Sequence, residues 1–360
     1  MTEPSVTAGR GDDFERMATQ ADRNVAAFDD RERGVMRSLQ HRLHSSPAVV
    51  PLVVLILSTV IFGVIVGSRF YSAFTLTLIL QQVAITGIVG VAETLVVLTA
   101  GIDLSVGAIM VLSSVVMGQV ALHYAVPGPL AVLIGFVVGG AAGLINGALV
   151  AKVNLPPFIV TLGTWSVFGA ANFIYSANET IRSQDVTATA PILQFFGNNF
   201  RVGGAVFTYG VLLMVVLAAL FWYVLNHTAW GRHVYAVGDD PEAALLSGIR
   251  VDRMLMSVYA VAGLICALAG WALIGRIGAV SPQAGQLENI NAITAVVIGG
   301  TSLFGGRGSI LGTLFGALIV GVFSLGLRLW GTDPQWTQLT VGALIIIAVA
   351  IDQWIRKVSG

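Results

Sequence analysis

Long apolar runs separated by short polar breaks make up most of the chain from residue 48 onward. A helix of about 20 apolar residues is needed to cross a bilayer core. Ten runs approach or exceed that length, at residues 48–67, 73–100, 104–124, 129–150, 158–175, 205–225, 254–274, 290–303, 310–329 and 338–355. The run at 290–303 is short and glycine-bounded, so we expect a broken or tilted helix there. The pattern predicts an all-α polytopic membrane protein, with its membrane domain over residues 48–355.

Composition supports a membrane location. Hydrophobic residues make up 56% of the chain and charged residues 11%, whereas a soluble domain carries about 25% charged residues. The mean hydropathy is +0.84. The 42 glycines favour close helix packing in lipid, where small residues let backbones approach. The formal net charge of zero implies no nucleic-acid partner, and Cys266 is the only cysteine, which excludes an internal disulfide.

The polar segment at residues 1–47 is expected to be a cytoplasmic tail, disordered or loosely helical, and residues 356–360 a cytoplasmic C-terminus. The tail is too long and too charged for a signal peptide. With the N-terminus inside and ten spans, fourteen of the 19 lysines and arginines fall inside and five outside, as the positive-inside rule requires. Without the tail the ratio is seven to five, so the count supports the first span's orientation more than the number of spans.

Residues 226–253 form the strongest polar interruption among the apolar runs. A short helix is expected inside this stretch. Asp239 or Asp240 can cap its start, Pro241 suits its first position, and Gly248 can adopt the left-handed conformation that closes it. Because so short a helix is marginal alone in water, we expect the rest of the chain to hold it and another protein to receive it.

No constellation of catalytic residues is present. The only lysines are Lys152 and Lys357, and neither follows a glycine, so the chain lacks the phosphate-binding loop of ATPases. The five histidines (41, 44, 123, 227 and 233) show no metal-ligand spacing. We therefore expect a protein without catalytic residues, metal or cofactor, which would depend on a separate ATPase for any ATP hydrolysis.

Polar residues within the apolar runs are the candidates for a substrate path, because a polar group in lipid usually faces a cavity or another helix. The candidates are Gln81, Gln82, Asp103, Ser105, Asn146, Thr161, Thr164, Asn172, Asn291 and Thr294. Amide and hydroxyl side chains suit a neutral, hydroxyl-rich sugar. The alternative for each is a structural role between helices, and Asp103 could instead cap a helix starting at Leu104. Glu93, also within an apolar run, should be near a boundary, paired or protonated.

Two glycine-interrupted segments occupy corresponding places in the two halves, at residues 101–107 and 299–309. Each lies between two apolar runs. Paired breaks of this kind are typical of inverted repeats around a central path, so we expect such a repeat here.

Four sequence blocks carry a resemblance to one family. They are GRHVYAVGDDPEAALLSGI at 231–249, GIDLSVG at 101–107, GLING with LPPFIVTLGT at 143–164, and IGGTSLFGGRGSILGT at 298–313. In this order and spacing they resemble the permease subunits of bacterial ABC sugar importers of the ribose, xylose and galactose type. The chain departs from the family at Ala100, where a glycine is usual, at Asp239 and Asp240, where Gly-Asn is common, and at residues 324–328, where an Asn-rich stretch is common.

The resemblance implies a type II ABC importer fold and a subunit of the bacterial inner membrane. Two permease subunits, expected to be a homodimer, would form the path, with ABC ATPase subunits inside and an extracytoplasmic sugar-binding protein outside. The coupling residues it implies are Gly231, Arg232, Asp240, Pro241, Glu242, Ala243, Ala244 and Gly248. Two alternatives remain open at this point: an ion-coupled secondary transporter using Glu93 or Asp103, and an ABC permease for amino acids.

Overall fold

The chain is almost entirely helical in a computed structural model, which describes residues 48–359. The predicted tail at residues 1–47 lies outside the described residues. In chain order the elements are α3 (Val49–Val66), η1 (Gly67–Arg69), α4 (Ala73–Leu98), α5 (Val106–His123), α6 (Gly128–Ala151), α7 (Pro157–Tyr175), α8 (Ser183–Thr189), η2 (Pro191–Gly197), β1 (Asn199–Val202), β2 (Ala205–Thr208), α9 (Tyr209–His227), α10 (Ala229–Asp239), α11 (Pro241–Leu246), α12 (Val251–Ile277), α13 (Glu288–Ile298), α14 (Ile310–Trp330) and α15 (Pro334–Ser359).

Eight helices in the described part of the chain are long and apolar enough to cross a membrane. They are α3 extended by η1, then α4, α5, α6, α7, α9, α12 and α14. Each matches one of the expected apolar runs, which confirms an all-α polytopic membrane protein. The sixth run begins later than expected, because residues 205–208 form β2 instead of the first turn of α9. Strands β1 and β2 pair as an antiparallel hairpin with Asn199 opposite Thr208.

The run at residues 290–303 does not form a full span. Helix α13 has 11 residues, which gives a length of about 16 Å, half of a bilayer core. Its last turn is followed by Gly299 and by Gly300, which has a positive φ of 80°. The chain then runs without regular structure until α14 begins at Ile310. The expectation of a broken helix at this run is therefore confirmed.

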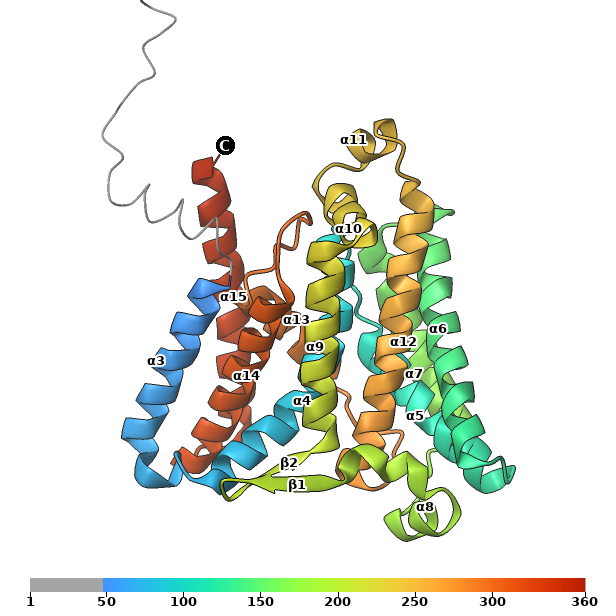
Figure 1. Cartoon of the computed structure of the whole chain (residues 1–360), viewed down its shortest axis with the longest axis vertical. Helices are drawn as coiled ribbons and strands as arrows, with labels where there is room; N and C mark the ends of the chain where they lie inside the picture. The colour runs from blue at the N-terminus through green and yellow to red at the C-terminus, as the bar shows by residue number, and fades with distance from the viewer. Residues whose placement is uncertain (1–47, 360) are drawn as a thin grey trace, which may run out of the picture. The chain divides into compact units, whose positions relative to one another are not determined.

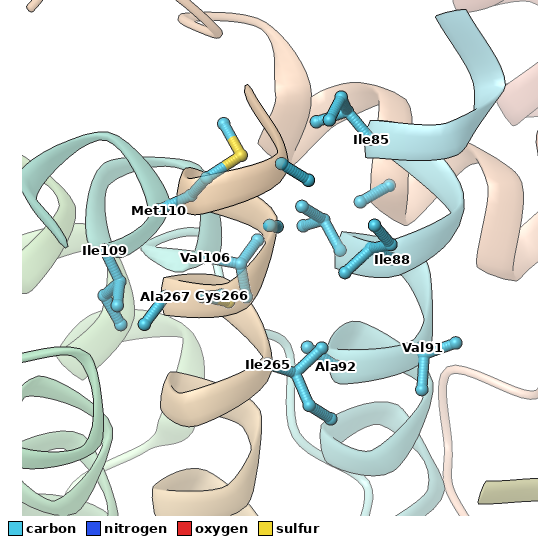
Figure 2. Packing of buried hydrophobic residues seen from close by; sticks show 14 of the residues in the cluster. Ile85, Ile88, Val91, Ala92, Val106, Ile109, Met110, Ile265, Cys266 and Ala267 are labelled. Carbon is cyan, nitrogen blue, oxygen red and sulfur yellow. The ribbon is translucent and has the colours of Figure 1, made fainter. Parts of the chain in front are cut away.

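Helix α4 is the centre of the fold. Every residue from Val83 to Leu98 is buried, as expected for a helix that is apolar on all faces. Figure 2 shows side chains of α4, including Ile88 and Ala92, beside Val106 of α5 and Ile265 of α12. By contrast, α3 exposes most of its apolar side chains, which suits a helix at the lipid boundary.

Glycines on α6 allow its close contact with α12. Gly139, Gly143 and Gly147 recur every four residues and therefore lie on one face of α6. A methyl group on Gly143 would overlap the carbonyl oxygen of Tyr259, and one on Gly139 would lie 2.6 Å from that of Gly263. The two backbones are in contact here, the arrangement that small residues permit in membrane proteins.

The extramembrane elements form two groups at opposite ends of α9. The first group, α8, η2 and the β1–β2 hairpin, precedes α9, and the second group, α10 and α11, follows it. Figure 1 shows α8 and the hairpin at one end of the helix bundle and α11 at the other. The polar stretch at residues 226–253 is thus presented beyond the ends of α9 and α12.

Candidate functional site

The polar stretch contains two short helices rather than one. Helix α10 begins after Thr228, whose Oγ1 accepts a hydrogen bond from the N–H of Gly231 at 3.2 Å. Its buried positions, Gly231, Val234, Val237 and Gly238, lie on one face, while Arg232 on the other side is exposed. Helix α10 is therefore amphipathic and lies against the ends of the membrane helices. The sequence analysis did not predict α10.

Helix α11 has the capped form that the sequence predicts. Asp240, rather than Asp239, is the N-cap residue, and its Oδ1 accepts hydrogen bonds from the N–H groups of Glu242 at 2.9 Å and Ala243 at 3.0 Å. At the other end, the N–H of Ile249 donates to the oxygen of Ala244 at 3.0 Å, and Gly248 has a φ of +87°. These contacts form a Schellman motif, which closes the helix.

The outer face of α11 is apolar and solvent-facing. Leu246 is 90% exposed and Leu245 62%, while Ala244 is buried against the chain. Glu242 and Ala243 are also exposed. A capped helix with an exposed apolar end and a nearby carboxylate is suited to bind in a groove on another protein. Leu245 and Leu246 were not among the expected coupling residues. Their position at the end of a six-residue helix is the sequence signal that could have identified them.

Helix α10 is in backbone contact with the end of α4 and with the glycine-interrupted segment at residues 299–309. A methyl group on Gly238 would overlap the carbonyl oxygen of Leu98, at the end of α4, and lie 2.8 Å from the nitrogen of Gly306. The N–H of Gly306 donates to that same oxygen of Leu98 at 3.0 Å. We call Leu98, Gly238 and Gly306 the glycine junction.

A side-chain contact reinforces the glycine junction. Tyr235 on α10 donates a hydrogen bond from its hydroxyl to the carbonyl oxygen of Gly308 at 3.0 Å. Burial raises the pKa of the Tyr235 phenol, so the hydroxyl stays protonated and remains a donor. Helix α10 is thus attached to residues 305–308 by both backbone and side chain.

Several of the predicted path residues form one buried network around the break between α4 and α5. The Oδ1 atom of Asp103 accepts from the N–H of Ser105 at 2.8 Å and from its Oγ at 2.6 Å. Ser105 Oγ accepts from Asn146 Nδ2 at 2.8 Å. Thr161 on α7 donates to the carbonyl oxygen of Ile102 at 2.8 Å. These contacts link α6 and α7 to the non-helical segment before α5. Asp103 caps the turn before α5, which starts at Val106 rather than Leu104.

Glu93 lies in the interior and not near a boundary. It is fully buried in α4, and its Oε1 accepts a hydrogen bond from the N–H of Asp103 at 3.2 Å. Its Oε2 has no hydrogen-bond partner among the described residues, and neither do Asn146 Oδ1 and the Tyr259 hydroxyl. The interior of the bundle therefore contains polar atoms that form no hydrogen bond with the described residues.

The other predicted path residues are spread over three helices. Gln81 and Gln82 are half-buried on α4, and Asn291 is half-buried on α13. Thr164 and Thr294 are buried and donate to carbonyl oxygens of their own helices. Asn172 on α7 lines a cavity of about 480 Å³ between α5, α7 and the segment before α13. The structure thus gathers Asp103, Ser105, Asn146 and Thr161 and leaves the rest apart.

Comparison with known proteins adds to this geometry. A family described as the permease component of the branched-chain amino acid transport system matches residues 75–349. The chain belongs to this family of permeases. It is 68% identical over 359 residues to the fructose import permease protein FrcC of Rhizobium meliloti, and the match covers 100% of both chains.

Other relatives carry sugar names as well. The ribose import permease protein RbsC of Bacillus subtilis is 38% identical over 294 residues, covering 82% of this chain and 89% of the relative. The D-allose transport system permease protein AlsC of Escherichia coli is 34% identical over 304 residues, covering 84% and 91%. No solved structure gives a significant match. The resemblance to sugar importer permeases is confirmed, and the chain is a multi-pass inner-membrane transporter subunit rather than an enzyme.

Proposed function

We propose that this permease is the membrane subunit of an ATP-driven importer for a monosaccharide, with fructose as the first substrate to test. The full-length similarity to a fructose import permease supports that choice. Transport would proceed by alternating access, with two copies of the chain forming the path at their interface. The amino-acid alternative is disfavoured because the similar permeases described above are named for sugars.

The observation that carries the proposal is the exposed apolar end of α11. A helix of six residues with Leu246 90% exposed would be left unsupported in water, and its two caps hold it ready for a partner. We assign that partner as the ABC ATPase subunit. Helix α11 would then face the cytoplasm, both chain termini would lie on the same side, and the coupling residues would be those from Gly231 to Gly248.

The opposite end of the bundle would receive the binding protein. The elements there are α8, η2 and the β1–β2 hairpin, which precede α9. Helix α9 has 19 residues, a length of about 28 Å, and separates these elements from α11. Exposed side chains of both charges, Arg182, Asp185 and Arg201, provide polar contacts for a soluble protein. Sugar released at this end would enter the path and leave at the end where the ATPase is bound.

Substitutions on α11 test the docking. Leu246→Asp places a charge on the apolar tip, and Glu242→Arg reverses the neighbouring charge; both side chains are exposed, so the fold should tolerate them. We expect co-purification of the ATPase from membranes to fall at least tenfold for Leu246→Asp, because a carboxylate would have to be buried in the groove, and sugar uptake to fall with it.

The matched control reverses a charge at the other end of the bundle. Glu179→Arg changes an exposed carboxylate between α7 and α8 and should leave ATPase co-purification unchanged. If both α11 variants retain the ATPase and take up sugar as the unmodified permease does, α11 is not the docking helix.

A further inference from the structure

The cavity beside α7 is bounded by a segment with unusual backbone structure. Residues 278–287 join α12 to α13 and form no helix or strand. A side chain on Gly118 of α5 would meet Val280 at 2.7 Å, and one on Gly107 would lie 3.7 Å from the carbonyl oxygen of Gly285. The two glycines are eleven positions apart on α5, so the segment follows α5 for about 16 Å.

Because α5 is a membrane span, this irregular segment lies at membrane depth. Backbone without regular hydrogen bonding is tolerated there only when protein covers it or when it lines a water-filled cavity. The cavity of about 480 Å³ is formed by α5, α7 and residues 282–287 of this segment. Its volume is within the ~300–1,000 Å³ typical of small-molecule sites. The cavity is therefore suited to water and a small solute.

Asn172 lines this cavity and ties α7 to the irregular segment. The side chain is 3% exposed, and its Nδ2 donates to the carbonyl oxygen of Pro282 at 2.8 Å. That bond fixes the amide, and its Oδ1 has no hydrogen-bond partner among the described residues. A buried acceptor left without a donor is costly.

The cavity also carries aromatic surface. Trp165 and Phe173, on the same helix as Asn172, line it and remain 41% and 36% exposed. Ser166 and Gln286 add a hydroxyl and an amide. Among the described residues that line the cavity none is charged. An apolar ring beside a few neutral polar groups matches a ligand with both C–H faces and hydroxyl groups.

We propose that this cavity is a transit site for a neutral monosaccharide, in which a C–H face of the sugar packs on Trp165 and its hydroxyl groups contact Ser166 and Gln286. The inference rests on the proposed function, because it places a step of sugar import in this cavity. Trp165 was absent from the expected path residues, since its apolar helix gave no polar signal.

Thiol labelling tests whether the cavity is aqueous and holds sugar. The one native cysteine, Cys266, is fully buried, so a cysteine introduced at the surface can be followed alone. Ser166→Cys lies in the cavity, and Val167→Cys, the next residue on α7, is 61% exposed but outside it. We expect a water-soluble methanethiosulfonate reagent to label Ser166→Cys in the assembled transporter at least tenfold faster than Val167→Cys, and D-fructose to slow the former only.

Labelling of neither cysteine would mean that lipid fills the cavity. That result overturns the proposal, and so does labelling that D-fructose leaves unchanged.

Uptake by the reconstituted transporter gives a second, independent test. Trp165→Ala should lower the maximal rate of ATP-driven D-fructose uptake about tenfold, the effect of losing one aromatic contact, and Trp165→Phe should restore most of it. Trp222→Ala on α9, a tryptophan that is also 41% exposed, is the control and should transport normally. Equal rates for Trp165→Ala and the control would overturn the transit site, whereas absence of ATP-driven uptake in the unmodified permease would overturn the proposed function.

Discussion

Asp103 lies at the centre of the buried network between α4 and α5. It is 1% exposed, and its Oδ1 accepts both hydrogen bonds from Ser105. Its backbone N–H donates to Glu93. The side chain therefore holds a non-helical turn together inside the protein, where unpaired N–H groups are costly.

Substitution at Asp103 separates this structural role from a role in the substrate path. Asp103→Asn keeps an acceptor oxygen and should leave the thermal unfolding midpoint in detergent within a few degrees. Asp103→Ala leaves the Ser105 groups without a partner and should destabilise the protein by about 1–3 kcal/mol, visible as a clear fall in that midpoint. The structural role would be contradicted if Asp103→Asn unfolded normally but abolished uptake.

The sequence identifies the polar residues of the spans but not their roles. Asp103, Asn146 and Asn172 are all polar residues inside apolar runs, and the sequence does not distinguish their roles. Only the fold shows that the first two are joined through Ser105, whereas Asn172 is bonded to the carbonyl oxygen of Pro282. Trp165 was missed because an apolar residue in an apolar run carries no signal until its exposure is known.

Among the elements, α10 connects α11 to the membrane interior. Its Gly238 lies against Leu98 at the end of α4 and against Gly306 before α14. Movement of α11 would reach the end of α4 and the segment at residues 299–309 through this one junction. The predicted inverted repeat stays a prediction. The sequence analysis anticipated the caps of α11, which depend on local chemistry, and missed α10, because two glycines in eleven residues weaken a helix signal.

The glycine junction should be sensitive to a single methyl group. Gly238→Ala would overlap the Leu98 carbonyl oxygen and separate α10 from α4. We expect uptake to fall at least tenfold while the ATPase still co-purifies, because α11 itself is unchanged. Gly163→Ala on α7, where an added methyl meets nothing within 4 Å, should behave like the unmodified permease. Normal uptake by Gly238→Ala would show that the junction does not transmit force.

The whole molecule combines predictable spans with irregular segments that composition does not reveal. Hydropathy located the eight described spans because each must present an apolar surface to lipid. It placed one run at residues 290–303, although α13 ends at Ile298 and Gly299 and Gly300 follow. The same part of the chain contains the glycine-rich loop of the junction and the segment that lines the cavity. We expect transport in this permease to depend on these places where regular structure stops.

The measurement that tests the account most directly is uptake into proteoliposomes. The permease is reconstituted with its ATPase, with binding protein and radiolabelled D-fructose outside and ATP enclosed, and without any ion gradient. The account predicts accumulation that requires ATP and is lost with Leu246→Asp. Accumulation driven by a sodium or proton gradient in liposomes that hold the permease alone, with no response to ATP, would contradict it.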